Sequence, residues 1–66
     1  MSVVKILEIF SESDKSFKDA VQNGVAKASE SVKNIRSAWV KEQKVEVEGS
    51  KVTKYRVLLK ISFVVE

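Results

Sequence analysis

The sequence contains no cysteine, no histidine and no proline, and only two glycines in 66 residues. Without cysteine the chain can form neither a disulfide nor a thiolate metal site. Without histidine it lacks the commonest transition-metal ligand and the commonest general base. A chain this short buries only about 60 % of the surface that it exposes when unfolded, so it usually depends on a cross-link or a partner. Because no such cross-link is available, we expect additional burial to come from self-association.

Long apolar runs and clustered charge are also missing. No stretch approaches the about 20 apolar residues of a membrane-spanning helix, and residues 1–10 lack the apolar core and cleavage site of a signal peptide. The net charge is +3, from 12 basic and 9 acidic residues, and the lysines are spread along the chain. Nucleic-acid binding usually shows a basic stripe on one element instead. We therefore expect a cytoplasmic protein whose partners include neither a membrane nor a nucleic acid.

The N-terminal part of the chain predicts a strand followed by a helix. Residues 3–10 are apolar and rich in β-branched side chains, which favours a strand, and the polar residues 11–14 favour a turn. Ser16 and Asp19 have the spacing of a capping box, which predicts that a helix begins at residue 17.

The predicted helix spans residues 17–33. Apolar side chains recur at helical spacing along it, at Phe17, Val21, Val25, Ala28 and Val32. The small residues Ala20 and Gly24 flank this stripe and would let the helix lie close to a sheet. Lys33 suits the negative end of the helix dipole, and Asn34 suits a left-handed cap.

Two long strands are predicted over residues 36–48 and 51–65. Gly49 and Ser50 between them fit a two-residue hairpin loop of type II′. In the last strand the odd-numbered side chains are mostly apolar and form the predicted buried face; they are Tyr55, Val57, Leu59, Ile61, Phe63 and Val65. In the preceding strand the apolar residues change phase near Glu42 and Gln43, which predicts a β-bulge or a bend.

These elements predict one α+β domain over residues 1–66. The order is β-α-β-β, with a three-stranded antiparallel sheet partly wrapped around one helix. A right-handed crossover makes the first two strands parallel, so the last strand can lie between them and run antiparallel to both.

The hairpin is longer than the helix that covers it. A strand of about 13 residues spans about 43 Å, whereas a helix of about 17 residues spans about 26 Å. The overhang is expected to carry Val45, Val47, Val52 and Tyr55. An exposed apolar strand edge invites aggregation unless it is covered, and copies of the same chain are the simplest cover. The alternative is a free hairpin arm in a monomer.

The ordered set of elements and short motifs resembles the dodecin family over nearly the whole chain. The motifs are Ser16 to Val21, Ala28-Ser29, Val32 to Ile35, Val40 to Gln43, Gly49 to Val52, Tyr55 to Val57 and Ile61 to Phe63. The resemblance implies a hollow homododecamer that binds flavins in pairs between subunits, for storage and quenching and without turnover. It also admits relatives that bind coenzyme A or metal ions, calcium included.

The resemblance implies a flavin site whose two ring contacts are changed in this chain. The family's stacking tryptophan corresponds to Ser37, and its ring-binding glutamine corresponds to Arg56. Trp39, two residues after Ser37, would point to the same face of the strand. The candidate cofactor-binding residues are therefore Ser37, Trp39, Gln43 and Arg56, with riboflavin, FMN or FAD as the implied ligand bound more weakly than in the family.

Two of these residues have alternative interpretations. Trp39 can stack on a ligand or anchor an interface between subunits, where tryptophan is enriched. Arg56 can pair with Glu42 across the hairpin or clamp a ligand phosphate.

Other chemistry is sparse. Glu42, Glu46 and Glu48 share one face of their predicted strand, and carboxylates can hold calcium or magnesium, but symmetry-related copies would have to complete such a shell. No nucleophile–base set, glycine-rich phosphate loop or paired-carboxylate motif is present, so we predict no enzymatic activity. The sequence thus leaves a flavin-binding storage protein as the leading hypothesis. A structural shell or ion-binding assembly without flavin is the alternative.

Overall fold

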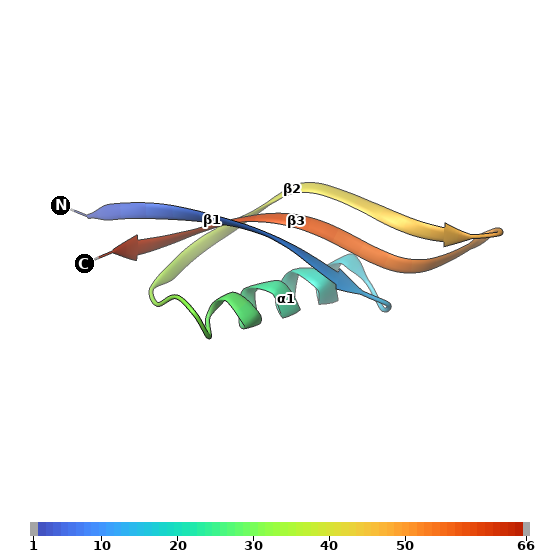
Figure 1. The fold of residues 1–66 in the computed structure, drawn as a ribbon, viewed down its shortest axis with the longest axis horizontal. Coiled ribbons are helices and arrows are strands. Elements are labelled where there is room, and N and C mark those ends of the chain that lie inside the picture. The colour runs from blue at the N-terminus through green and yellow to red at the C-terminus, as the bar shows by residue number, and fades with distance from the viewer. Residues whose placement is uncertain (1, 66) are drawn as a thin grey trace.

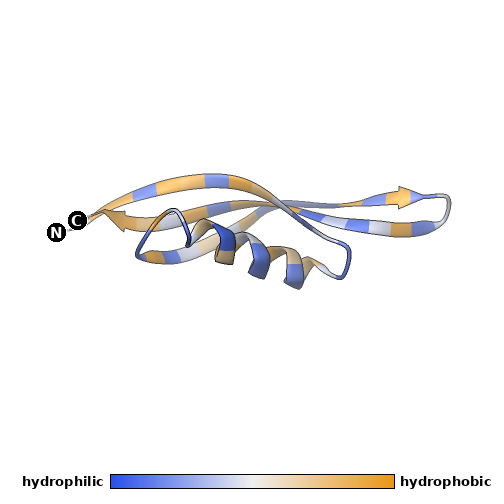
Figure 2. Ribbon diagram, turned by 60° about the horizontal axis from the view of Figure 1, so that its bottom comes forward, coloured by the Kyte–Doolittle hydropathy of each residue, from blue (hydrophilic) through white to orange (hydrophobic). Residues whose placement is uncertain are grey.

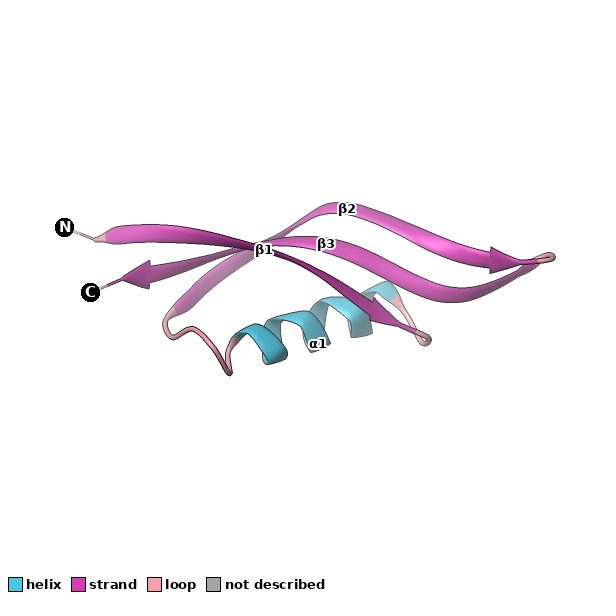
Figure 3. Ribbon diagram, in the orientation of Figure 1, coloured by secondary structure: helices cyan, strands magenta, loops and turns pink. Residues whose placement is uncertain are grey.

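The computed structural model describes residues 2–65, and its elements follow the predicted order. They are β1 (Val3–Ser13), α1 (Phe17–Ala28), β2 (Ile35–Glu48) and β3 (Lys51–Val65). Figure 1 shows one helix lying against one face of a twisted sheet, and Figure 3 shows that strands make up most of the chain. The predicted α+β fold is confirmed.

The last strand lies in the middle of the sheet. The strand order is β1-β3-β2, and β3 pairs antiparallel with both neighbours. Pairing starts at Val3 opposite Val65 and, on the other side, at Ile35 opposite Phe63. β1 and β2 are therefore the two edge strands, and both depend on β3 for their backbone hydrogen bonds.

The start of α1 was predicted correctly. The Ser16 side chain accepts a hydrogen bond from the backbone N–H of Asp19 at 2.9 Å, as an N-cap does. Ser13, the last residue of β1, donates to the Asp19 carboxylate at 2.7 Å and accepts from the Lys15 N–H at 2.9 Å. β1 thus runs three residues past the predicted end at Phe10, because its final serine is tied to the helix cap.

The end of α1 was predicted too late. The helix ends at Ala28 instead of Lys33. The N–H groups of Glu30 and Ser31 bond to carbonyls three residues back, at 3.1 and 3.0 Å, so the chain tightens and leaves the α-helical path. Asn34 has the predicted left-handed conformation, with φ 63°, but it serves the turn into β2.

The core lies between α1 and the odd-numbered face of β3. Val57, Leu59 and Ile61 are fully buried there, as predicted, whereas Val65 is 38 % exposed. The buried line of α1 consists of small residues, namely Ala20, Gly24 and Ala28. Phe17, Val21, Ile35, Leu7 and Ile9 pack around this centre.

Gly24 permits the close approach of the helix to the sheet. A Cβ atom at this position would lie 2.7 Å from the Leu59 Cδ1 and 3.0 Å from the Ser11 Cβ. Both distances are shorter than the usual contact between carbon atoms. The helix therefore lies against both β1 and β3 only because this residue has no side chain.

The β2–β3 hairpin continues beyond the helix, as predicted. The molecule measures 51 × 19 × 13 Å, and Figure 1 shows the hairpin tip past the start of α1. Val45, Val47 and Val52 are 36 %, 57 % and 44 % exposed on this overhang, which shows alternating apolar and polar bands in Figure 2. Gly49 has φ 63° at the tip, which suits the predicted type II′ turn.

Tyr55 does not belong to the exposed overhang. Its ring packs edge-on against Phe17, the first residue of α1, with the ring centroids 5.1 Å apart. The overhang is shorter than predicted on this side because the helix begins beneath Tyr55.

Candidate functional site

The face of the sheet opposite α1 carries the candidate site. We call it the helix-free face. Because side chains alternate along a strand, it presents the even-numbered residues of β1 and β3, paired as Glu8 with Lys60, Phe10 with Leu58 and Glu12 with Arg56. Large apolar side chains on this face are exposed, namely Val4, Ile6, Phe10 and Trp39.

A bulge at Lys41 decides which β2 side chains reach this face. Val40 pairs with Leu59 and Glu42 with Leu58, so Lys41 is an extra residue without a partner on β3. The predicted phase change is confirmed, one residue earlier than Glu42. A further register shift lies between Ile35, which packs against the core, and Ser37. Between that shift and Lys41 the odd-numbered residues Ser37 and Trp39 share the helix-free face, and after Lys41 the even-numbered residues do.

The register separates the four predicted site residues. Ser37 is paired with Ser62, Trp39 with Lys60 and Lys44 with Arg56, all on the helix-free face. Gln43 is paired with Val57, a core residue, so the alternation places its side chain on the other face. The register thus brings Ser37, Trp39 and Arg56 to one face of the sheet and places Gln43 opposite a core residue, although Gln43 still lines the depression beside Arg56.

Trp39 is an open aromatic surface with cations beside it. The side chain is 54 % exposed, and the Lys60 Nζ lies 5.9 Å from the centroid of its ring. Lys41 Nζ, from the bulge, lies 3.5 Å from Glu8 Oε2 on β1. Trp39, Val40, Lys41 and Lys60 line a depression of about 270 Å³.

Ser37 is engaged in a contact within the sheet. Its Oγ lies 2.6 Å from the Oγ of Ser62 on β3, and Ser62 is buried. The two hydroxyl groups form a hydrogen bond with each other across the β2–β3 pair. The position that corresponds to the family's tryptophan therefore holds a small cross-strand hydrogen bond.

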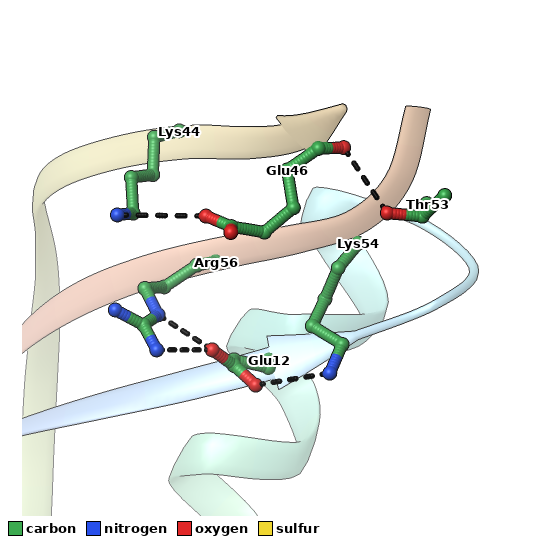
Figure 4. Close-up of polar contacts among 6 residues, drawn as sticks. All are labelled: Glu12, Lys44, Glu46, Thr53, Lys54 and Arg56. Carbon is green, nitrogen blue, oxygen red and sulfur yellow. Dashed lines mark hydrogen bonds and ion pairs between the residues drawn. The ribbon is translucent and has the colours of Figure 1, made fainter. Parts of the chain in front are cut away.

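Arg56 binds a different carboxylate from the one predicted. Its Nε donates to Glu12 Oε2 at 2.6 Å and its terminal nitrogen lies 2.5 Å from the same oxygen, as Figure 4 shows. The ion-pair interpretation of Arg56 is confirmed, but the partner is Glu12 instead of Glu42, because Glu12 is the direct partner of Arg56 in the β1–β3 register. The guanidinium also lies over Phe10, 5.3 Å from the ring centroid.

Both oxygens of Glu12 face cations. Lys54 Nζ lies 3.6 Å from Oε1, on the side opposite Arg56. The hydrogen bond from Arg56, with the positive charges of Arg56 and Lys54, holds the pKa of the Glu12 carboxyl below its ordinary value. Glu12 is thus a charged cross-strand link between β1 and β3, and it occupies the guanidinium edge that a ligand phosphate would need.

A second depression lies beside Arg56. It has a volume of about 180 Å³ and is lined by Phe10, Glu42, Gln43, Lys44, Arg56 and Leu58. Small-molecule sites usually measure about 300–1,000 Å³, so both depressions are small for a flavin. A ligand of that size needs a further surface over the helix-free face.

The glutamates of β2 do not form a metal site within one chain. Lys44 lies between Glu42 and Glu46 on the same face, and its Nζ is 3.5 Å from Glu46 Oε2. In the part of the chain that the structure describes, no three acidic side chains gather as metal ligands would. Over the same residues 2–65, the helix is too short to span a membrane.

Four contributors to this surface were missed by sequence analysis: Glu8, Phe10, Glu12 and Lys60. Glu8, Phe10 and Glu12 lie on β1 and reach the site through the β1–β3 register, whereas Lys60 lies on β3 and reaches Trp39 through the β2–β3 register. The even-numbered alternation of β3 is visible in the sequence, but the partner of each residue on β1 depends on pairing between distant segments.

The family model for dodecin matches residues 3–66. The chain belongs to the dodecin family. A calcium dodecin of Mycobacterium tuberculosis is 38 % identical over 63 residues, which cover 96 % of this chain and 89 % of that protein. The match confirms the family resemblance of the sequence.

Solved dodecin structures share the fold over the full chain. A variant of the Thermus thermophilus dodecin has a TM-score of 0.94 at 26 % identity, covering 100 % of this chain and 98 % of that one. The Mycobacterium tuberculosis calcium dodecin, described as having a novel calcium-binding site, has a TM-score of 0.83 at 36 % identity and covers 98 % and 93 %. The β-α-β-β arrangement is thus the dodecin fold.

Proposed function

We propose that this dodecin is a homo-oligomeric protein that binds and stores a planar aromatic ligand of the flavin class, without turnover. The observation that carries the proposal is the exposed indole of Trp39 on the helix-free face, 54 % exposed beside an open depression. Aromatic rings gain from stacking beyond the area that they bury. Trp39 would supply the stacking surface that Ser37 cannot.

Self-assembly is part of the proposal because one chain provides only part of the site. The two depressions are small and open, and the exposed valines of the overhang give copies of the chain an apolar surface to cover. The family resemblance favours twelve copies. Light scattering should therefore give a mass near twelve chains, whereas a monodisperse monomer at micromolar concentration would refute the assembly.

Flavin titration tests the ligand. The chain has a single tryptophan, so quenching of its fluorescence reports directly on Trp39, and flavin fluorescence reports on the ligand. Trp39→Ala should abolish binding, and Trp39→Phe should retain part of it because a ring remains. Flavin binding that is equal in wild type and Trp39→Ala, with the assembly intact, would show that Trp39 does not hold the ligand.

Rebuilding the family's contacts provides a positive control. The double variant Ser37→Trp with Arg56→Gln restores both of them and should raise flavin affinity. Arg56→Gln alone is the matched control, because it frees Glu12 without adding an aromatic ring. If the double variant binds no flavin, the cavity between subunits differs from that of flavin-binding dodecins.

The match to a calcium dodecin favours a second candidate function, ion binding by an assembly without flavin. Glu42, Glu46 and Glu48 on β2 are the carboxylates that copies of the chain could bring together. Calorimetric titration with calcium tests it on wild type and on Glu46→Gln, with Glu30→Gln after the helix as control. Calcium binding that Glu46→Gln weakens, together with no response to flavins, would replace the first proposal.

A further inference from the structure

The charges around Trp39 come from all three strands. Glu8 on β1, Lys60 on β3 and Trp39 on β2 lie in one row across the sheet, because Lys60 is the direct partner of both others. Lys41 joins the row from the bulge. The row thus holds two cations and one carboxylate, and Lys60 lies over the indole.

The two lysines are not equivalent. Lys41 is held by Glu8 at 3.5 Å. Lys60 forms no ion pair within residues 2–65, and its Nζ lies over the Trp39 ring. The contact that the structure gives this ammonium is with the face of the indole ring. Lys60 is therefore the cation of this row that is available to a new anion.

The position of Lys60 affects neutral and anionic ligands in opposite ways. A ring that stacks on the face of Trp39 under Lys60 must displace the ammonium from the indole. A neutral ligand offers the displaced ammonium no anionic partner, whereas a ligand phosphate accepts a charge-assisted hydrogen bond from it. Arg56 cannot fill this role as readily, because Glu12 already occupies its guanidinium.

We infer that Lys60 is the specificity-determining residue of the Trp39 site, selecting planar aromatic ligands that carry a phosphate over neutral ones. This inference rests on the proposed function. It assigns the phosphate contact to the lysine beside the stacking ring and not to Arg56, for which a phosphate contact was one of two interpretations.

The test compares FMN with riboflavin, which share a ring system and differ in the phosphate. Wild type should bind FMN about tenfold more tightly, as one charged hydrogen bond allows, and this preference should fall as salt is added. Lys60→Gln should weaken FMN binding and leave riboflavin binding equal or stronger. Lys60→Arg should restore the preference, and Lys27→Gln on the exposed side of α1 is the control.

Glu8→Gln provides a test in the opposite direction. The substitution removes the carboxylate that pairs with Lys41 and so raises the net positive charge of the row. It should therefore increase the preference for FMN. Flavin binding with a preference that neither Lys60→Gln nor Glu8→Gln alters would overturn this inference alone. No response of Trp39 fluorescence to either flavin, in an intact assembly, would overturn the proposed function and this inference with it.

Discussion

The two faces of the sheet differ although the same strands build both. On the helix side, Val57, Leu59 and Ile61 have no exposed surface. On the helix-free side, their neighbours Arg56 and Lys60 lie opposite Glu12 and Glu8 in the β1–β3 register. Phe10 and Trp39 are 63 % and 54 % exposed on the same side. Odd-numbered residues of β3 thus hold the fold together, while even-numbered ones are available to ligands and other copies.

Substitutions on the two faces of the sheet should therefore change different properties of the protein. A change on the helix side should alter the free energy of unfolding of the chain itself. A change on the helix-free side should alter ligand affinity, assembly or pH dependence, and should alter the fold less. Unfolding measurements on an assembly must be made at equal chain concentration, because association adds to the apparent stability.

The largest effect is expected for Leu59→Ala. Leu59 is fully buried at the centre of the core, and removing such a side chain costs about 2–5 kcal/mol. Leu58→Ala, one residue away on the helix-free face, is the matched control. Urea unfolding should show a markedly larger loss for Leu59→Ala; equal losses would mean that both faces are equally buried in the assembly.

Gly24→Val should have the next largest effect. Its side chain would overlap with Leu59 and Ser11, since even a Cβ atom lies within 3.0 Å of each, and overpacking costs about 1–3 kcal/mol. Ala26→Val, on the exposed side of α1, carries the same β-branched side chain without the overlap and should cost less. Thermal unfolding of the two variants measures the difference, and equal melting temperatures would contradict the close approach of helix and sheet.

Glu12→Gln should lower stability at neutral pH and make stability fall less steeply in acid. The pKa of Glu12 is lowered in the fold by the Arg56 hydrogen bond and the nearby cations. The folded state is therefore stabilised more by the ionised carboxylate than by the protonated carboxyl group. Its contribution is complete above the ordinary pKa of glutamate and is lost as the pH falls through the lowered value.

Urea unfolding of wild type and Glu12→Gln from neutral pH down to acid measures this contribution. The two stability curves should converge at low pH. Glu30→Gln, whose carboxylate pairs with the exposed Lys27 at 3.4 Å, is the control and should leave the pH dependence nearly unchanged. Curves that stay parallel for Glu12→Gln would show that its ion pairs contribute nothing to folding.

The fold was predictable where the signal is local. The N-cap at Ser16, the Gly49 turn and the alternation of β3 each involve residues close in sequence, and each was confirmed. The end of α1 was missed because the apolar spacing continues to Val32 while the backbone tightens after Ala28. Periodicity alone does not report that change.

The candidate site was predictable only in part, because it depends on register. Ser37 and Trp39 were expected on one face and lie there. The bulge at Lys41 places Gln43 opposite the core residue Val57, although Gln43 still lines the depression beside Arg56. Arg56 pairs with Glu12 instead of Glu42 because β1 pairs directly with β3. A residue of β1 and its partner on β3 are separated by most of the chain, as Glu12 and Arg56 are, so no local pattern identifies the pair.

The central position of β3 also sets the order in which the molecule can fold. β1, α1 and β2 precede it along the chain, yet neither edge strand has a sheet partner until β3 is present. During synthesis, the earlier segments leave the ribosome without a core and with unpaired backbone groups. The sheet therefore cannot form before β3 is available, and until then β1 and β2 carry the unpaired backbone groups through which chains aggregate.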